Sequence, residues 1–131
     1  MAVMSLAVSS PSILTDLHLQ FIKQLDDHAG QFEYWAMEHL RMNAIYWSMT
    51  ALQLLKGSDW ESYSPLSRQE IIEFVLECQN DDGGFGGNVN MESHVLYTLS
   101  AIQILYILKE LSSIDTDQVE KYILSLQLPD G

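Results

Sequence analysis

A glycine-rich turn between two apolar stretches limits the possible folds of this chain more than any other sequence feature. Four glycines fall within residues 83–87. Glycine adopts backbone conformations that other residues avoid, so this cluster predicts a compact turn. The residues before it have the spacing of one helical face: Ile71, Ile72, Val75 and Leu76. After it, residues 93–108 include no Asp, Glu, Lys or Arg, which predicts a buried helix.

This helix–turn–helix pattern occurs more than once in the chain. Residues 74–83 resemble residues 122–131, with an offset of 48, and residues 47–55 resemble residues 97–105, with an offset of 50. Self-similarity over a period of about 20–50 residues is typical of helical-hairpin repeats, each of which must pack on its neighbours. The sequence therefore predicts an all-α fold. We expect a mobile leader over residues 1–13 and a single repeat domain over residues 14–131.

The spacing of apolar residues and capping signals predicts five helices. They are expected over about 14–25, 33–56, 67–78, 90–111 and 115–126, with a loop at 58–66. Ser67 and Glu70 have the spacing of a capping box, and Asn90 and Asp115 are candidate caps for the fourth and fifth helices. The uncharged stretches of the second and fourth helices, residues 42–55 and 93–108, are expected to be buried nearly all round.

The charge balance limits the partners that such a domain would bind. Six Lys and Arg against 18 Asp and Glu give a net charge of −12, which repels nucleic-acid phosphates and anionic membrane surfaces. The uncharged stretches are shorter than the ~20 residues that span a bilayer, so no membrane span is expected. The single cysteine fits a reducing compartment, which favours a cytoplasmic location.

Several residues of the types that bind zinc surround the glycine turn. Cys78 occupies a position where the next repeat has Leu126, so we interpret it as a core residue. Asp81 and Asp82 are expected to hold the turn through bonds to its backbone. His94 is expected to cap the following helix or to be partly buried.

Two segments of the sequence resemble a known family. The stretch CQNDDGGFGGNVNMESHVLYTLSAIQIL at residues 78–105 resembles the repeats of protein prenyltransferase β subunits. The stretch FEYWAMEHLRMNAIYWSMTALQLL at residues 32–55 is similar to the N-terminal signature of the β subunits of Rab geranylgeranyltransferases, the type II enzymes. The resemblance implies an α/α toroid, incomplete in this chain, whose inner helices surround an apolar cavity.

The resemblance also implies a function and a set of binding residues. These β subunits work with an α subunit, and they transfer geranylgeranyl from geranylgeranyl diphosphate to C-terminal cysteines of Rab GTPases presented by a Rab escort protein. By the motif match, Asn43, Tyr46, Trp47 and Leu99 would bind the isoprenoid. The family has bulky aromatic residues at the Asn43 and Leu99 positions where a shorter lipid is used, so the smaller residues here fit a longer lipid.

The reacting centre of the family is not expected in this chain. The family's zinc ligands are an Asp-x-Cys pair and a later His, and the sequence has no Asp-x-Cys. We therefore expect no catalytic or metal-binding residue here, an apolar face left bare at the second repeat, and a chain that is inactive by itself as part of a longer β subunit.

Two other interpretations remain open at this point. A non-catalytic helical-repeat module that binds a protein partner would show the same features. Phe74, Gln79, Gly83 and Phe85 also resemble the repeat motif of triterpene cyclases, although the Asp-rich acid motif of those enzymes is absent. His39 lies close to the predicted cavity residues, and a role there is a further hypothesis.

Overall fold

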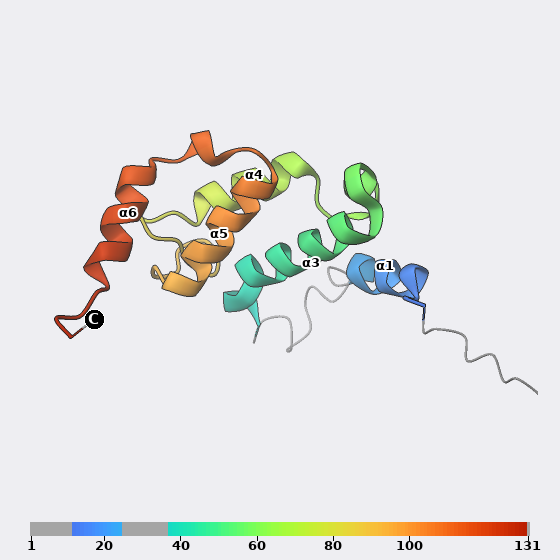
Figure 1. Ribbon diagram of the computed structural model, residues 1–131, viewed down its shortest axis with the longest axis horizontal. Coiled ribbons are helices and arrows are strands. Elements are labelled where there is room, and N and C mark those ends of the chain that lie inside the picture. Colours follow the sequence, from blue (N-terminus) through green and yellow to red (C-terminus); the bar gives the residue numbers. More distant parts are fainter. Residues whose placement is uncertain (1–11, 25–36, 131) are drawn as a thin grey trace, which may run out of the picture.

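The computed structural model describes residues 12–24 and 37–130, which form helices joined by turns (Figure 1). The helices are α1 (Thr15–Gln24), η1 (Glu38–Leu40), α3 (Arg41–Lys56), η2 (Gly57–Tyr63), α4 (Arg68–Glu77), α5 (Val95–Ile107), η3 (Leu111–Ser113) and α6 (Thr116–Ser125), with η denoting 3-10 helices. Within this described part of the chain there is no β-strand, and one isolated bridge joins Gln79 to Phe85. The predicted all-α fold is confirmed. Most of the predicted leader lies outside the described residues.

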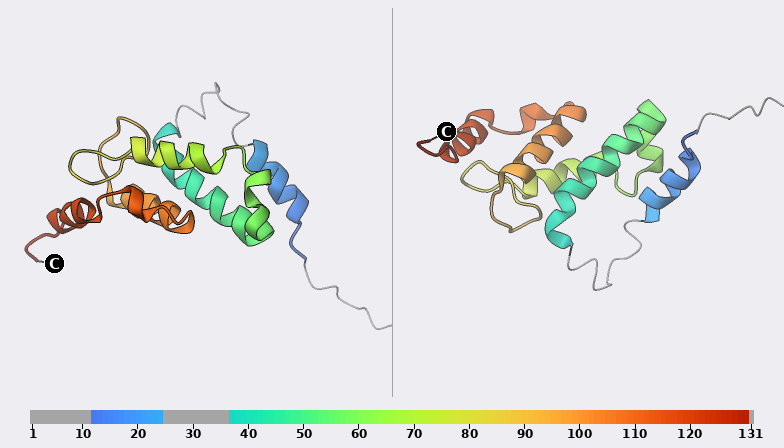
Figure 2. Two further views of the ribbon diagram at one scale, coloured as in Figure 1. Left: turned by 90° about the horizontal axis from the view of Figure 1, so that it is seen from above. Right: turned by 60° about the horizontal axis from the view of Figure 1, so that its bottom comes forward.

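Helix α5 packs against both α3 and α4, and η2 folds back onto α3. Helix α1 packs against α3 at one end of the molecule, and α6 lies at the other end (Figures 1 and 2). The fully buried core is drawn from α3, α4, α5 and the glycine turn: Met42, Met49, Leu52, Val75, Phe85, Ile104 and Leu105. The repeat pattern predicted from sequence thus corresponds to helices that pack on their neighbours.

Backbone hydrogen bonds join the glycine turn to the end of α4 and to the start of α3. The Gly86 N–H donates to the Cys78 carbonyl at 2.9 Å, and the Met42 N–H at the start of α3 donates to the Gly87 carbonyl at 2.9 Å. A Cβ on Gly87 would lie 1.9 Å from the His39 carbonyl oxygen, so only glycine permits this approach. Gly83 has a φ of 88°, the left-handed region that favours glycine.

Two of the predicted helix caps are present, and one is wrong. Ser67 and Glu70 form a complete capping box at the start of α4, and Asp115 accepts the N–H groups that begin α6. Asn90 caps no helix, because its backbone has a φ of 62° and turns the chain instead. His94 caps α5 instead: its Nδ1 accepts the Leu96 N–H at 3.1 Å. Capping was one of the two roles predicted for this residue.

Several predicted boundaries also differ from the structure. Helix α3 begins at Arg41 after the short turn η1, and residues 33–36 of the predicted helix lie outside the described residues. The predicted loop at 58–66 contains η2, because Trp60 is buried against the core and draws this segment onto α3. Helix α5 ends at Ile107 rather than near Leu111, since Lys109 has a left-handed φ of 59°.

The first predicted helix exists as α1, but most of its apolar stripe faces outward. Leu14, Leu17 and Phe21 are each more than 60% exposed, whereas Leu19 and Ile22 are buried. The described part of the chain packs against α1 mainly through α3, so only a narrow face of α1 is covered.

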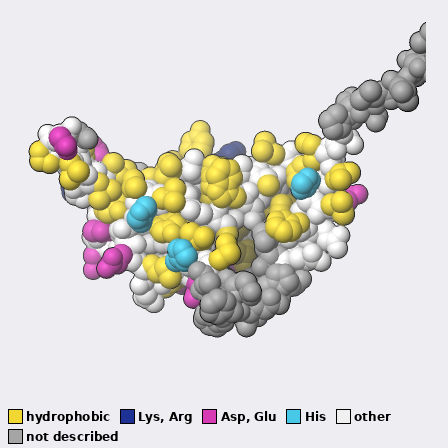
Figure 3. Space-filling model, turned by 90° about the horizontal axis from the view of Figure 1, so that it is seen from below, with side chains coloured by type: hydrophobic (Ala, Val, Ile, Leu, Met, Phe, Trp, Pro, Cys, Tyr) yellow, Lys and Arg dark blue, Asp and Glu magenta, His cyan; other side chains and the backbone are white. Residues whose placement is uncertain are grey.

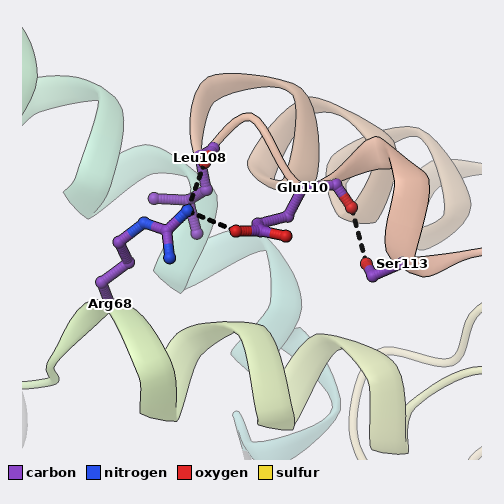
Figure 4. Close-up of polar contacts among 4 residues, drawn as sticks. All are labelled: Arg68, Leu108, Glu110 and Ser113. Carbon is purple, nitrogen blue, oxygen red and sulfur yellow. Dashed lines mark hydrogen bonds and ion pairs between the residues drawn. The ribbon is translucent and has the colours of Figure 1, made fainter.

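An arginine at the start of α4 joins that helix to the end of α5 (Figure 4). Arg68 Nη2 donates to the Leu108 carbonyl at 2.7 Å and pairs with Glu110 Oε1 at 2.6 Å. The Ser113 hydroxyl in turn donates to the Glu110 carbonyl at 2.6 Å. This cluster satisfies a free carbonyl at the helix end and fixes where the chain leaves α5 for α6.

Replacement of Thr98 tests the bond between the glycine turn and α5. Its buried hydroxyl accepts the Phe85 N–H at 2.9 Å and donates to the His94 carbonyl at 3.0 Å. Thr98→Val keeps the shape but leaves the buried Phe85 N–H unpaired, so the free energy of unfolding should fall by about 2 kcal/mol. Thr98→Ser keeps the hydroxyl and should cost about 1 kcal/mol. Urea denaturation measures both, and a larger loss for the serine variant would contradict this role.

The reactivity of Cys78 tests its place in the core. Burial raises the pKa of the Cys78 thiol to about 12, with a smaller opposing effect from the positive charge of Arg41. The thiolate is the reactive form, so at pH 8 the folded protein should react very slowly with a thiol reagent. A matched Ser112→Cys variant adds an exposed thiol on η3 and should react quickly at that site. Equal rates at the two cysteines would show that Cys78 is accessible.

Candidate functional site

The four residues predicted to bind a lipid lie on two neighbouring helices. Asn43, Tyr46 and Trp47 lie on the first two turns of α3, and Leu99 lies on the second turn of α5. The Ser100 hydroxyl, next to Leu99, donates a 2.7 Å hydrogen bond to Asn43 Oδ1 and so joins the two helices. The rings of Tyr46 and Trp47 meet edge to face, with centroids 5.0 Å apart. The structure therefore brings all four residues to one region, and their role in binding stays a prediction.

Two of these residues belong to an apolar surface that α3 and α5 leave uncovered. We call it the open face and define it by its exposed large side chains: Trp47, Leu54, Leu96, Leu99 and Tyr106. Trp47 is 66% exposed and Leu99 is 52% exposed. Figure 3 shows hydrophobic side chains gathered across the middle of the molecule, where α3 and α5 lie in Figure 1. Exposed apolar patches of this kind commonly mark a binding site.

The open face corrects the expectation that the uncharged helices are buried all round. Each helix has a buried side, represented by Met49 on α3 and Ile104 on α5, and an exposed side that is also apolar. Uniform apolar character predicted burial on all sides because a soluble helix usually has a polar outer face. These helices instead present apolar side chains to a space that other described residues do not fill.

The electrostatic character of the open face differs from that of the whole chain. No Asp, Glu, Lys or Arg occurs in residues 42–55 or on α5, although the chain carries a net charge of −12. In Figure 3 the acidic side chains lie at the edges of this view rather than at its centre. An uncharged, apolar ligand would therefore gain contact area here without displacing water from a charged group.

Sequence reasoning missed four residues of this region. Leu54, Leu96 and Tyr106 lie on the same helical stripes as Trp47 and Leu99, and steps of three or seven residues from the predicted positions would have found them. Ser100 was missed because its importance depends on the position of α3 relative to α5. No sequence signal marks such a contact before the packing is known.

The residues of zinc-binding type do not form a metal site in the structure. Within residues 12–24 and 37–130, no three His, Cys, Asp or Glu side chains lie close enough together to hold a metal ion. The Cys78 thiol is buried, and in the described part of the chain it lies in no group of three side chains that could bind a metal. Asp82 accepts the Gly84 N–H and the Ser93 hydroxyl, which confirms its expected role in the turn. The described residues therefore do not fit zinc.

The two remaining histidine and aspartate predictions have separate outcomes. Asp81 is exposed and makes no hydrogen bond from its side chain within the described part of the chain, so its predicted role in holding the turn is wrong. His39 is exposed, and its backbone carbonyl lies directly against Gly87, so its main chain packs against the glycine turn. A role of its imidazole at the open face stays a hypothesis.

None of the described helices is long and apolar enough to cross a bilayer.

Comparison with known proteins identifies several relatives. The chain is 45% identical over 94 residues to "Probable geranylgeranyl transferase type-2 subunit beta" of Dictyostelium discoideum, which covers 72% of this chain and 26% of that protein. It is 37% identical over 126 residues to "Geranylgeranyl transferase type-2 subunit beta" of Candida albicans, covering 87% of this chain and 35% of the relative. The protein of the same name from Saccharomyces cerevisiae is 38% identical over 126 residues, covering 93% of this chain and 37% of that protein.

These relatives confirm the resemblance drawn from residues 32–55 and 78–105. The chain spans between about a quarter and just over a third of the length of these three proteins. The family described as "Prenyltransferase alpha-alpha toroid domain" matches residues 13–131, which include every described helix and the whole open face. The chain therefore belongs to the prenyltransferase alpha-alpha toroid family.

Proposed function

We propose that these residues are the N-terminal portion of the β subunit of a Rab geranylgeranyltransferase. In this proposal the open face is part of the wall of the pocket that holds the isoprenoid of geranylgeranyl diphosphate. The single observation that carries it is the uncharged, exposed apolar surface of α3 and α5 in a chain that is otherwise strongly acidic. The relatives named as type-2 β subunits supply the reaction class.

The physical match between the open face and an isoprenoid supports this assignment. Burial of apolar surface contributes about 25 cal/mol per Å², so a long hydrocarbon chain binds best along a continuous apolar surface. Trp47 and Leu54 on α3 and Leu99 and Tyr106 on α5 provide large apolar side chains on adjacent helices. A flat aromatic ring such as that of Trp47 offers wide contact with a hydrocarbon chain at little cost in conformational entropy.

The size of the side chains supports the longer of the two common protein-bound isoprenoids. Asn43 and Leu99 are smaller than the aromatic residues found at these positions where a farnesyl chain is used, so more room is left for a geranylgeranyl chain. Asn43 is also held against α5 by its hydrogen bond to Ser100, which keeps its side chain near the seam between the helices.

The chemistry itself would take place outside the described residues. In prenyl transfer, the sulfur of the acceptor cysteine forms a bond to C1 of the isoprenoid as the C1–oxygen bond breaks and diphosphate leaves. We propose that the zinc ligands lie elsewhere in the full-length protein, that an α subunit completes the enzyme, and that a Rab GTPase presented by a Rab escort protein supplies the cysteine. The single buried cysteine is compatible with a cytoplasmic location.

The direct test of this proposal is a transfer assay with the full-length protein and its partner subunit. Fluorescently labelled geranylgeranyl diphosphate and a Rab protein with its escort protein should give labelled Rab. A Rab protein that lacks its C-terminal cysteines is the control and should remain unlabelled. Absence of transfer, with the lipid also failing to bind, would overturn the assignment.

Replacement of Leu99 tests whether the open face sets the length of the lipid. Leu99→Trp fills space above α5, and overpacking of this kind costs about 1–3 kcal/mol, so preference for geranylgeranyl over farnesyl diphosphate should fall about tenfold. Glu73→Trp, which adds the same side chain on the exposed side of α4, is the control and should leave the preference unchanged. Competition binding of the two lipids measures this ratio. An unchanged ratio for Leu99→Trp would remove Leu99 from the pocket wall.

A further inference from the structure

One polar contact lies within the otherwise apolar region formed by α3 and α5. The Ser100 hydroxyl donates to Asn43 Oδ1 at 2.7 Å, and this bond connects residues that are far apart in sequence. Ser100 is 4% exposed, while Asn43 is half-buried. A buried hydroxyl needs a hydrogen-bond partner, so the pair is held in place by the cost of breaking it.

The position of this pair links it to the open face. Asn43 lies one helical turn before Trp47 on α3, and Ser100 directly follows Leu99 on α5. Trp47 and Leu99 are both exposed on the open face, so the Asn43 amide lies at its border. The amide group is polar and would lose its contact with water if an isoprenoid were to cover it, a loss that burial of hydrocarbon does not compensate.

We propose that Ser100 is a positioning residue that holds the Asn43 side chain along the seam between α3 and α5, out of the path of the lipid. This inference rests on the proposed function of the open face. With the bond in place, the amide is drawn against α5, and the pocket keeps its full depth. Without it, the amide is free to adopt other rotamers, some of which project over Trp47 and Leu99 and shorten the space for the chain.

The proposal predicts an effect of Ser100 that depends on Asn43. Ser100→Ala removes the hydroxyl and releases the amide, so preference for geranylgeranyl over farnesyl diphosphate should fall about three- to tenfold, the factor that a typical hydrogen bond contributes. Asn43→Ala removes the amide itself, and the lipid preference of this variant is the reference against which the second substitution is measured. In the Asn43→Ala background, Ser100→Ala should then have no further effect, because no amide remains to be released.

The experiment uses the full-length protein assembled with its partner subunit. The two lipid diphosphates are measured by competition binding, and KM and kcat are measured separately for each. The change should occur in KM for the longer lipid, with kcat nearly unchanged, because the pair lies within the lipid-binding face rather than at the reacting bond. Ser125→Ala is the matched control: among the described residues its hydroxyl bonds to the Tyr122 carbonyl within α6, and its lipid preference should equal that of the wild type.

The possible outcomes separate this inference from the proposed function. If the wild-type protein binds neither lipid, the proposed function is wrong and this inference is wrong with it. If the wild type prefers geranylgeranyl but Ser100→Ala keeps that preference, the positioning role is overturned while the function stands. If Ser100→Ala lowers the preference equally with and without Asn43, its effect is on packing in general, and the positioning role is again overturned.

Discussion

The close approach of the glycine turn to the start of α3 is the constraint on which the rest of the structure depends. The Gly87 carbonyl accepts the first buried N–H of α3, and the absence of a side chain lets the two backbones meet. The same turn is bonded to Thr98 on α5 through Phe85. One short segment therefore fixes the beginnings of both α3 and α5. Because both helices start from the same anchor, their uncharged sides are set next to one another.

The two repeats show how much the surroundings of a residue decide its burial. Val75 on α4 is fully buried beneath α5, whereas Ile123, which has the equivalent position on α6, is 44% exposed. An apolar groove of about 310 Å³ borders Ile123 and includes Ile102 and Val119. The expectation of a bare apolar face at the second repeat is thus confirmed. The sequence pattern predicts which face of its helix a residue lies on. Whether that face is buried depends on the presence of a neighbouring helix.

Much of the fold follows from local signals in the sequence. The capping box at Ser67 and the cap at Asp115 were found because they depend on residues only a few positions apart. Asn90 and Trp60 were misjudged because a left-handed turn and a long-range burial depend on tertiary contacts. For the candidate binding region, the motif match predicted Asn43, Tyr46, Trp47 and Leu99, and the structure places them on the adjacent helices α3 and α5. The contact between Asn43 and Ser100, which are 57 residues apart along the chain, could be found only once the relative position of α3 and α5 was known.

The separation of charge from the open face means that the two sides of this molecule respond to different solution conditions. Contacts made on the uncharged sides of α3 and α5 depend on hydrophobic burial, which changes with temperature and is weakened by cosolvents such as urea that solvate apolar groups. Contacts made with the acidic surfaces of α4 and α6 depend on Coulomb forces, which are screened over about 8–10 Å at ordinary ionic strength. Added salt would therefore loosen a basic partner on the outside while leaving an apolar ligand in place.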